Sequence, residues 1–238
     1  MRCPRCGHEQ TDALEVCRRC GVYFARFRPR PVRRPVPKQA PGLSWLRQRL
    51  FEVPPAEDRL MVVLRAFGWL VLVVWGIRIL TLPFAGPELL GSFLHWIHLP
   101  FHEAGHVVFR PFGSFLHILG GTLGQLLVPL IVLGAFLHQK DPFGAAFGCW
   151  WLGTSFIDCA PYINDARARQ LLLISGETGQ EGWEGHDWFQ LLSRTGHLED
   201  DHLLARGFWA AGALLVLAAL AWGGYVLWRQ WRGPQKTA

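Results

Sequence analysis

Charged residues are scarce in the apolar stretches of this sequence, and apolar residues are scarce in its charged stretches. Half of its 238 positions are hydrophobic and only 18% are charged, yet the formal net charge is +6. The N-terminal segment is cysteine-rich and basic, and the first apolar run comes late, so no cleavable signal peptide is expected. This segregation is typical of a membrane protein with a small soluble appendage.

Apolar runs predict an all-α polytopic membrane protein with about five transmembrane helices. The runs cover about 60–80, 89–109, 119–137, 143–163 and 203–228, and crossing a bilayer takes roughly 20 residues. The membrane domain is therefore expected over residues 60–238, with a polar loop at 167–202. Basic residues before the first run favour a cytoplasmic N-terminus in a bacterial inner (plasma) membrane. Five spans would then place Arg229, Arg232 and Lys236 outside, so either one segment is re-entrant or the charge rule fails here.

The second run contains the motif HExxH, formed by His102, Glu103 and His106. Residues four apart lie on one face of a helix, so the two imidazoles could hold one Zn²⁺ with the glutamate beside its open position. Glu103 could then take a proton from zinc-bound water. It is also the only formal charge between Leu89 and Phe109, and an ionisable residue inside a span suggests a functional site. The nearby His95 and His98 are interpreted as packing residues or as the lining of a wet cavity.

A membrane helix that carries HExxH resembles the site-2-protease type of intramembrane zinc metalloprotease, especially its small bacterial branch. In that family a Gly-rich motif ending in an amide residue opens the next span. Gly120, Gly121 and Gly124 match the small residues, and Gln125 stands about where the family usually has Asn. A buried amide near the site could hydrogen-bond the substrate backbone or support the metal ligands, so the role of Gln125 stays open, whereas the glycines alone are better explained by close helix packing.

The third zinc ligand is expected from a carboxylate later in the chain. The family pattern is an Asn, a Pro three residues on, and an Asp followed by a small residue. Asp158-x-x-Pro161 and Asp165-Ala166 follow this outline, which implies Asp165 as the ligand. Asp158 is the alternative, because its apolar surroundings are harder to explain without a cation. His186 and Asp187 in the polar loop are rival ligands or a supporting pair, unless the loop is a lid or a partner surface.

Residues 1–27 read as a zinc ribbon. Two CxxC pairs, Cys3 with Cys6 and Cys17 with Cys20, supply the four thiolates of a closed structural Zn²⁺ site. Disulfides or a redox CxxC are the alternatives, but the basic flank favours the cytosol, where thiols stay reduced. So small a segment has almost no apolar core, so the metal would supply its folding free energy.

Residues 28–59 are predicted to be a basic, Pro- and Arg-rich linker, with a short interfacial helix at about 43–53. Such a run beside a zinc ribbon could bind nucleic acid. Attraction to anionic lipid headgroups explains it better, so nucleic acid is not an expected partner.

Together these observations predict an intramembrane zinc endopeptidase with one catalytic and one structural Zn²⁺. Its substrates would be transmembrane segments of other proteins, cleaved near the cytoplasmic side in regulated intramembrane proteolysis. The alternative is a non-proteolytic membrane scaffold or receptor whose zinc ribbon recruits a cytosolic partner.

Overall fold

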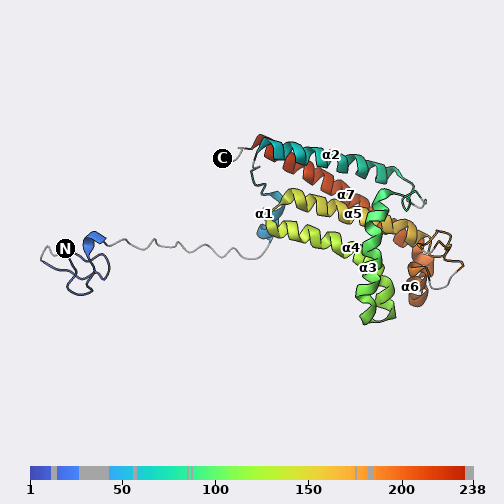
Figure 1. Cartoon of the computed structure of the whole chain (residues 1–238), viewed down its shortest axis with the longest axis horizontal. Helices are drawn as coiled ribbons and strands as arrows, with labels where there is room; N and C mark the ends of the chain where they lie inside the picture. Colours follow the sequence, from blue (N-terminus) through green and yellow to red (C-terminus); the bar gives the residue numbers. More distant parts are fainter. Residues whose placement is uncertain are drawn as a thin grey trace. The chain divides into compact units, whose positions relative to one another are not determined.

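The structure is a computed structural model that describes residues 1–11, 15–26, 43–55, 58–84, 86, 88–174, 176–181 and 185–233. Its contacts divide the chain into two units, Met1–Pro41 and Gly42–Ala238. The described residues form helices and three isolated β-bridges, as expected for an all-α protein with a small N-terminal module (Figure 1). Residues 28–42 of the linker predicted at 28–59 lie outside the described residues.

The N-terminal unit consists of two similar turns. Each CxxC pair lies between the two residues of an antiparallel β-bridge, which are Arg2 and Glu9 in the first turn and Val16 and Tyr23 in the second. The glycine after each second cysteine has a positive φ, +71° at Gly7 and +69° at Gly21, a conformation that glycine adopts without strain. A short 3₁₀ helix, η1 (Phe24–Arg26), follows the second turn.

The described part of the helical unit contains seven α-helices: α1 (Leu43–Phe51), α2 (Arg59–Thr81), α3 (Phe93–Phe109), α4 (Ser114–Gln139), α5 (Pro142–Asn164), α6 (Asp187–Thr195) and α7 (Asp201–Arg232). Two 3₁₀ helices, η2 (Arg110–Phe112) and η4 (Leu198–Asp200), precede α4 and α7. Side-chain caps fix several starts: Asp58 accepts a hydrogen bond from the Met61 amide, and Asp141 accepts from Phe143 and Gly144. The helix at 43–51 agrees with the short helix predicted there.

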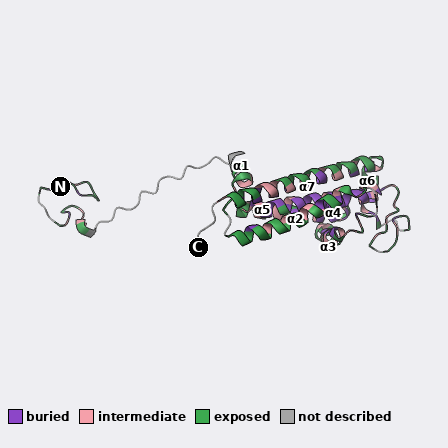
Figure 2. Cartoon of the chain, turned by 90° about the horizontal axis from the view of Figure 1, so that it is seen from above, coloured by how far each residue is buried: buried purple, intermediate pink, exposed green. Residues whose placement is uncertain are grey.

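Helix α5 is the centre of this unit and has more buried positions than any other helix (Figure 2). It packs antiparallel to α7 through small residues, because a side chain on Gly153 or Gly212 would collide with backbone atoms of the facing helix. Helix α2 packs antiparallel on α7, where the Trp69 indole donates a hydrogen bond to the Leu220 carbonyl. The second half of α4 packs along α5, with Gly148 against Leu133.

Helix α3 differs from the other long helices in direction. It runs across α2, α5 and α7 (Figure 1) and is seen nearly end-on in Figure 2. Its second half packs closely against the first half of α4, because a Cβ on Gly105 would lie 2.0 Å from the Gly120 carbonyl oxygen. A Cβ on Gly124 would likewise lie 2.5 Å from the Phe101 carbonyl oxygen. The predicted close packing of these glycines is therefore present, and it fixes α3 against α4.

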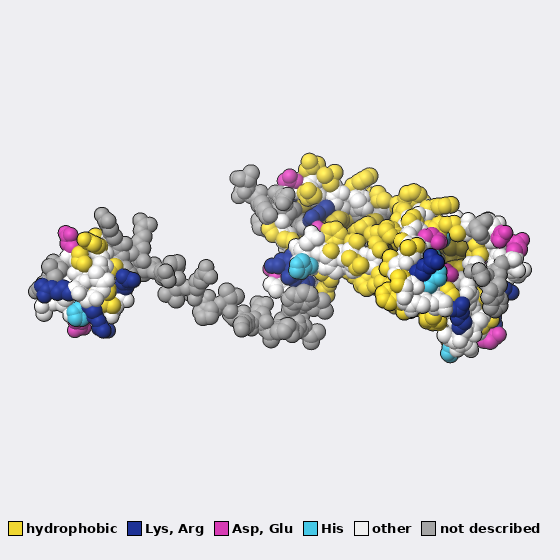
Figure 3. Space-filling model, turned by 60° about the horizontal axis from the view of Figure 1, so that its bottom comes forward, with side chains coloured by type: hydrophobic (Ala, Val, Ile, Leu, Met, Phe, Trp, Pro, Cys, Tyr) yellow, Lys and Arg dark blue, Asp and Glu magenta, His cyan; other side chains and the backbone are white. Residues whose placement is uncertain are grey.

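Within the described part of the chain, three helical segments are long and apolar enough to cross a membrane: Arg59–Thr81, Ser114–Gln139 and Leu198–Arg232. The outer face of α2 is made of exposed apolar side chains, and only 11% of its apolar window is buried. Hydrophobic side chains cover the middle of the helical unit between charged ends (Figure 3). These features indicate a membrane protein with three candidate spans, fewer than the five predicted. Helix α3 and the heavily buried α5 are not among the three.

Candidate metal centre

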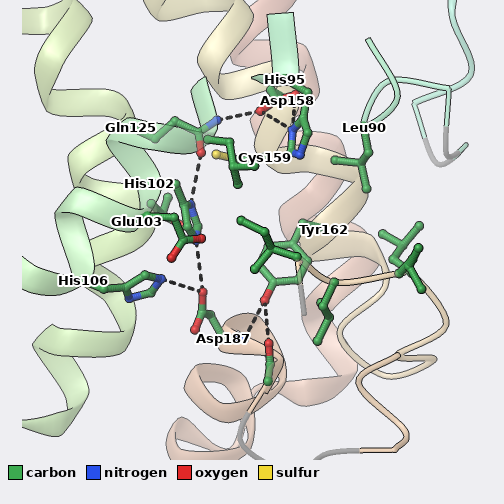
Figure 4. Close-up of a pocket in the computed structure, with 17 residues that line it drawn as sticks. Leu90, His95, His102, Glu103, His106, Gln125, Asp158, Cys159, Tyr162 and Asp187 are labelled. Carbon is green, nitrogen blue, oxygen red and sulfur yellow. Dashed lines mark hydrogen bonds and ion pairs between the residues drawn. The ribbon is translucent and has the colours of Figure 1, made fainter. Parts of the chain in front are cut away.

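Helix α3 presents both histidines of the HExxH motif to one point. The two rings lie one helical turn apart, with centroids separated by 4.9 Å. The Nε2 atoms of His102 and His106 are each 3.2 Å from Oδ2 of Asp187, the first residue of α6 (Figure 4). These three side chains form one of two groups in the described part of the chain that could hold a metal ion.

The other ring nitrogen of each histidine is fixed by a hydrogen bond. Nδ1 of His106 lies 2.8 Å from the His117 carbonyl oxygen, which can only accept, so Nδ1 carries the proton. Nδ1 of His102 lies 3.2 Å from Oε1 of Gln125, whose amide nitrogen donates to Asp158 at 2.8 Å. Gln125 therefore turns its oxygen toward His102. Both imidazoles are held as the tautomer whose Nε2 has a free lone pair, as the outer hydrogen-bond partners of metal-binding histidines commonly arrange.

Three electron-pair donors thus face one another with no hydrogen atom between them in the neutral tautomers. Two imidazole lone pairs and a carboxylate oxygen repel unless a cation, either a proton or a metal ion, lies among them. Tetrahedral zinc with bonds of roughly 2.0–2.1 Å separates its ligand atoms by roughly 3.3–3.4 Å. The observed 3.2 Å separations are close to that value. The residues therefore fit a three-ligand zinc site with an open fourth position.

The space for the ion is preserved by a glycine on α4. A Cβ on Gly121 would lie 2.5 Å from Nε2 of both His102 and His106, and 2.7 Å from Cε1 of His106. A side chain at this position would collide with both rings at their Nε2 atoms. Gly121 is thus required by the space between the histidines, whereas Gly120 and Gly124 are required by backbone contact.

A cavity opens beside this point, with Glu103 on its wall (Figure 4). Glu103 lies between the two histidines in sequence and is exposed to the cavity and to solvent. Apolar side chains line much of the rest, including Leu90, Leu99 and the segment 171–174. The cavity therefore offers a carboxylate base, a metal-binding point and an apolar surface in one place.

Asp187 is held in position from the end of α5. Its backbone amide donates to the Tyr162 hydroxyl at 2.9 Å, and Tyr162 packs on the His186 ring at a centroid distance of 4.3 Å. The buried His186 accepts from the Phe189 amide through Nδ1, and its Nε2 lies 3.4 Å from Asp165. Burial alone would raise the pKa of the Asp187 carboxyl, but the adjacent His102 and His106 rings outweigh it and lower the pKa when they carry a proton on Nε2.

Asp165 is not grouped with the two histidines. Its carboxylate accepts hydrogen bonds from the backbone amides of Gln170 and Leu171, at 3.0 and 2.9 Å, and pairs with His186. These bonds overcome the effect of burial and lower the pKa of Asp165. Asp165 thus connects the loop after α5 to the residue preceding Asp187, which makes it a positioning residue for this site.

Asp158, the alternative ligand in the sequence, lies on the far side of Gln125 from His102. Its carboxylate is 3.1 Å from Nδ1 of His95 and 3.3 Å from Nδ1 of the fully buried His98. The structure therefore joins His95, His98 and Asp158 in a buried polar cluster that reaches His102 through Gln125. Gln125 supports His102 and Asp158 and also lines the cavity, so a contact with substrate stays a prediction.

Sequence reasoning gave no role to Tyr162 or to the His117 carbonyl. Neither belongs to a recognisable motif, since Tyr162 acts through its hydroxyl near the end of α5 and His117 acts through its backbone carbonyl. Asp187 was held only as a rival to Asp165. Its signal in the sequence was a His-Asp pair at the start of a short amphipathic helix. In the structure Asp187 contacts His102, which lies 85 positions earlier in the chain.

The four N-terminal cysteines form the second group able to hold a metal ion. Sγ of Cys3 lies 3.7 Å from Sγ of Cys20, and Cys6 is equally far from Cys17. Burial opposes ionisation of Cys3, but hydrogen bonds from the Cys6 and Arg5 amides outweigh it and lower the pKa of Cys3 to about 6, whereas burial and the three neighbouring thiols raise the pKa of Cys20 to about 12. Thiolate is the form that binds metal, so the predicted cluster of four cysteines is present with geometry suited to one ion.

No protein-family model matches this chain, no curated protein is significantly similar to it, and no solved structure matches it.

Proposed function

We propose that the helical unit is a zinc-dependent membrane endopeptidase whose metal ligands are His102, His106 and Asp187. The observation that carries this proposal is the convergence of two oriented Nε2 lone pairs and one carboxylate oxygen on a space kept open by Gly121. Zinc bound there would polarise a scissile carbonyl and lower the pKa of an attacking water to about 7. The N-terminal four-cysteine module is proposed to hold a second, structural zinc, because a full set of four thiolates leaves no open position.

Glu103 is the proposed general base. It lies on the cavity wall one residue from His102, where it can accept the proton of the attacking water and pass it to the leaving amine nitrogen. The apolar wall of the cavity favours polypeptide segments with apolar side chains. The resemblance of the HExxH region to site-2-type proteases supports peptide bonds as the target.

The test replaces Glu103 with Gln in the full chain and compares zinc content and peptide hydrolysis. A quenched fluorescent peptide library rich in apolar residues serves as the probe, and Glu52→Gln, at an exposed position directly after α1, is the matched control. We expect Glu103→Gln to keep its zinc and to lose roughly 10²–10⁴-fold in hydrolysis, while Glu52→Gln keeps both. Equal hydrolysis by wild type and Glu103→Gln would refute the proposed mechanism. A chain with zinc only in the four-cysteine module would favour the scaffold or receptor instead.

A further inference from the structure

The helical unit has two chemically different ends. At one, which we call the basic end, α1, the start of α2, the α4–α5 turn and the end of α7 meet. There Arg49 donates to the Leu137 and His138 carbonyls, and Arg65 contacts both Asp141 and Gln230. At the other, which we call the site end, α2 and α5 finish, α7 begins, and α3 and α6 form the metal centre.

The path of the chain gives four passes between these ends. Helix α2 runs from the basic end to the site end, α4 returns, α5 goes out again and α7 returns. At about 1.5 Å per residue, the 23 residues of α5 extend about 34 Å, enough to cross the roughly 30 Å hydrocarbon core. Its modest hydropathy follows from its central place, because it faces other helices rather than lipid. Helix α3 lies across the others and adds no pass (Figure 1).

An even number of passes places the start of α2 and the end of α7 on the same side. The described basic end has seven Lys and Arg residues against three Asp and Glu: Arg47, Arg49, Arg59, Arg65, Lys140, Arg229 and Arg232 against Glu52, Asp58 and Asp141. Five more basic residues precede α1 directly in the sequence, namely Arg28, Arg30, Arg33, Arg34 and Lys38. The described site end has six basic residues and ten acidic ones, and its Arg167 is paired with Asp201 and Glu199.

We propose that the basic end is cytoplasmic and that the metal centre opens on the opposite, non-cytoplasmic face of the membrane. Lys and Arg accumulate on the cytoplasmic side of membrane spans, whereas Asp and Glu contribute little to orientation. This arrangement removes the conflict that five spans create at Arg229 and Arg232. It differs from the cytoplasmic location expected from the sequence, because that expectation counted α3 as a span.

The depth of the site agrees with an opening at that face. Asp158 lies six residues, or about 9 Å, from the end of α5, and Asp187 lies beyond that end. The exposed side chains of Leu172 and Ile174 border the cavity. If the proposed peptidase activity holds, the substrates are membrane-anchored polypeptides whose apolar segment emerges at the non-cytoplasmic surface.

The orientation can be tested in intact bacterial host cells with a membrane-impermeant maleimide. Ser193→Cys places a thiol on the exposed face of α6 at the site end, and Gln139→Cys places one at the exposed end of α4 at the basic end. The wild-type chain, with its six native cysteines, gives the background. We expect Ser193→Cys to be labelled in intact cells and Gln139→Cys only after the membrane is permeabilised. A C-terminal alkaline phosphatase fusion should be inactive.

A chain with five spans would give the reverse labelling pattern and an active phosphatase fusion, and this result would overturn the proposal. Labelling of both positions, or of neither before permeabilisation, would also contradict it. Labelling requires neither zinc nor activity, so zinc content and hydrolysis measured on the same membranes test the proposed function separately.

Discussion

Replacing Gly121 with Ala should strongly weaken zinc binding at the membrane site while leaving the fold intact. The added Cβ would lie 2.5 Å from Nε2 of His102 and of His106, whereas ordinary van der Waals contact begins at 3.4 Å. Each ring would have to retreat by roughly 0.9 Å, and ligand distances in metal sites vary by only about ±0.2 Å. We therefore expect zinc affinity to fall at least 100-fold, or about 2.7 kcal/mol.

The matched control is Gly134→Ala in the same helix, where an added Cβ meets nothing within 4 Å. Alanine is the better helix former by about 1 kcal/mol, so neither variant should lose helicity. The assay is competition with a chelator of known affinity in detergent, with circular dichroism to follow the helices. If Gly121→Ala binds zinc as tightly as Gly134→Ala, the metal is not held between these histidines.

Three further outcomes follow from the contacts around the site. Asp187→Ala should lose the membrane zinc, whereas Asp200→Ala on the exposed η4 should keep it, as measured by metal content; zinc retained in Asp187→Ala would exclude Asp187 as a ligand. Gln125→Ala should lower the zinc affinity about 10–100-fold, because the His102 ring loses the hydrogen bond that orients it. An unchanged affinity in chelator competition would show that this hydrogen bond is dispensable. The pKa of Asp165 is lower in the folded protein than its ordinary value of 3.8. The Asp165 carboxylate therefore stabilises the fold at pH values above 3.8, and this contribution is lost as the pH falls through the lower pKa of the folded state. Thermal unfolding of the zinc-free chain should therefore show Asp165→Asn less stable than wild type at pH 7 with a smaller loss on acidification, and parallel pH profiles would contradict this role.

The local features of the site could be predicted from sequence because each depends on neighbouring residues. HExxH spacing aligns His102 and His106 on any helix, and the glycine motif allows α3 and α4 to approach whatever surrounds them. The two CxxC pairs likewise gather their own sulfurs. These predictions need only the geometry of a turn of helix or of a tight loop.

The third ligand and the direction of α3 could not be predicted in the same way. Asp165 and Asp187 both follow α5, and which one reaches His102 depends on how the loop between them folds back. Asp165 is engaged by backbone amides and His186, which leaves Asp187 for the histidines. Hydropathy could not distinguish α3 from a span, because an apolar helix packed across a bundle has the same composition as one that crosses lipid.

The central claim is that the HExxH residues hold a metal, and zinc per chain measures it most directly. Full-length wild type purified in detergent should contain two zinc ions, His102→Ala one and Cys17→Ser one. A wild-type chain with a single zinc that survives His102→Ala and disappears with Cys17→Ser would contradict the account.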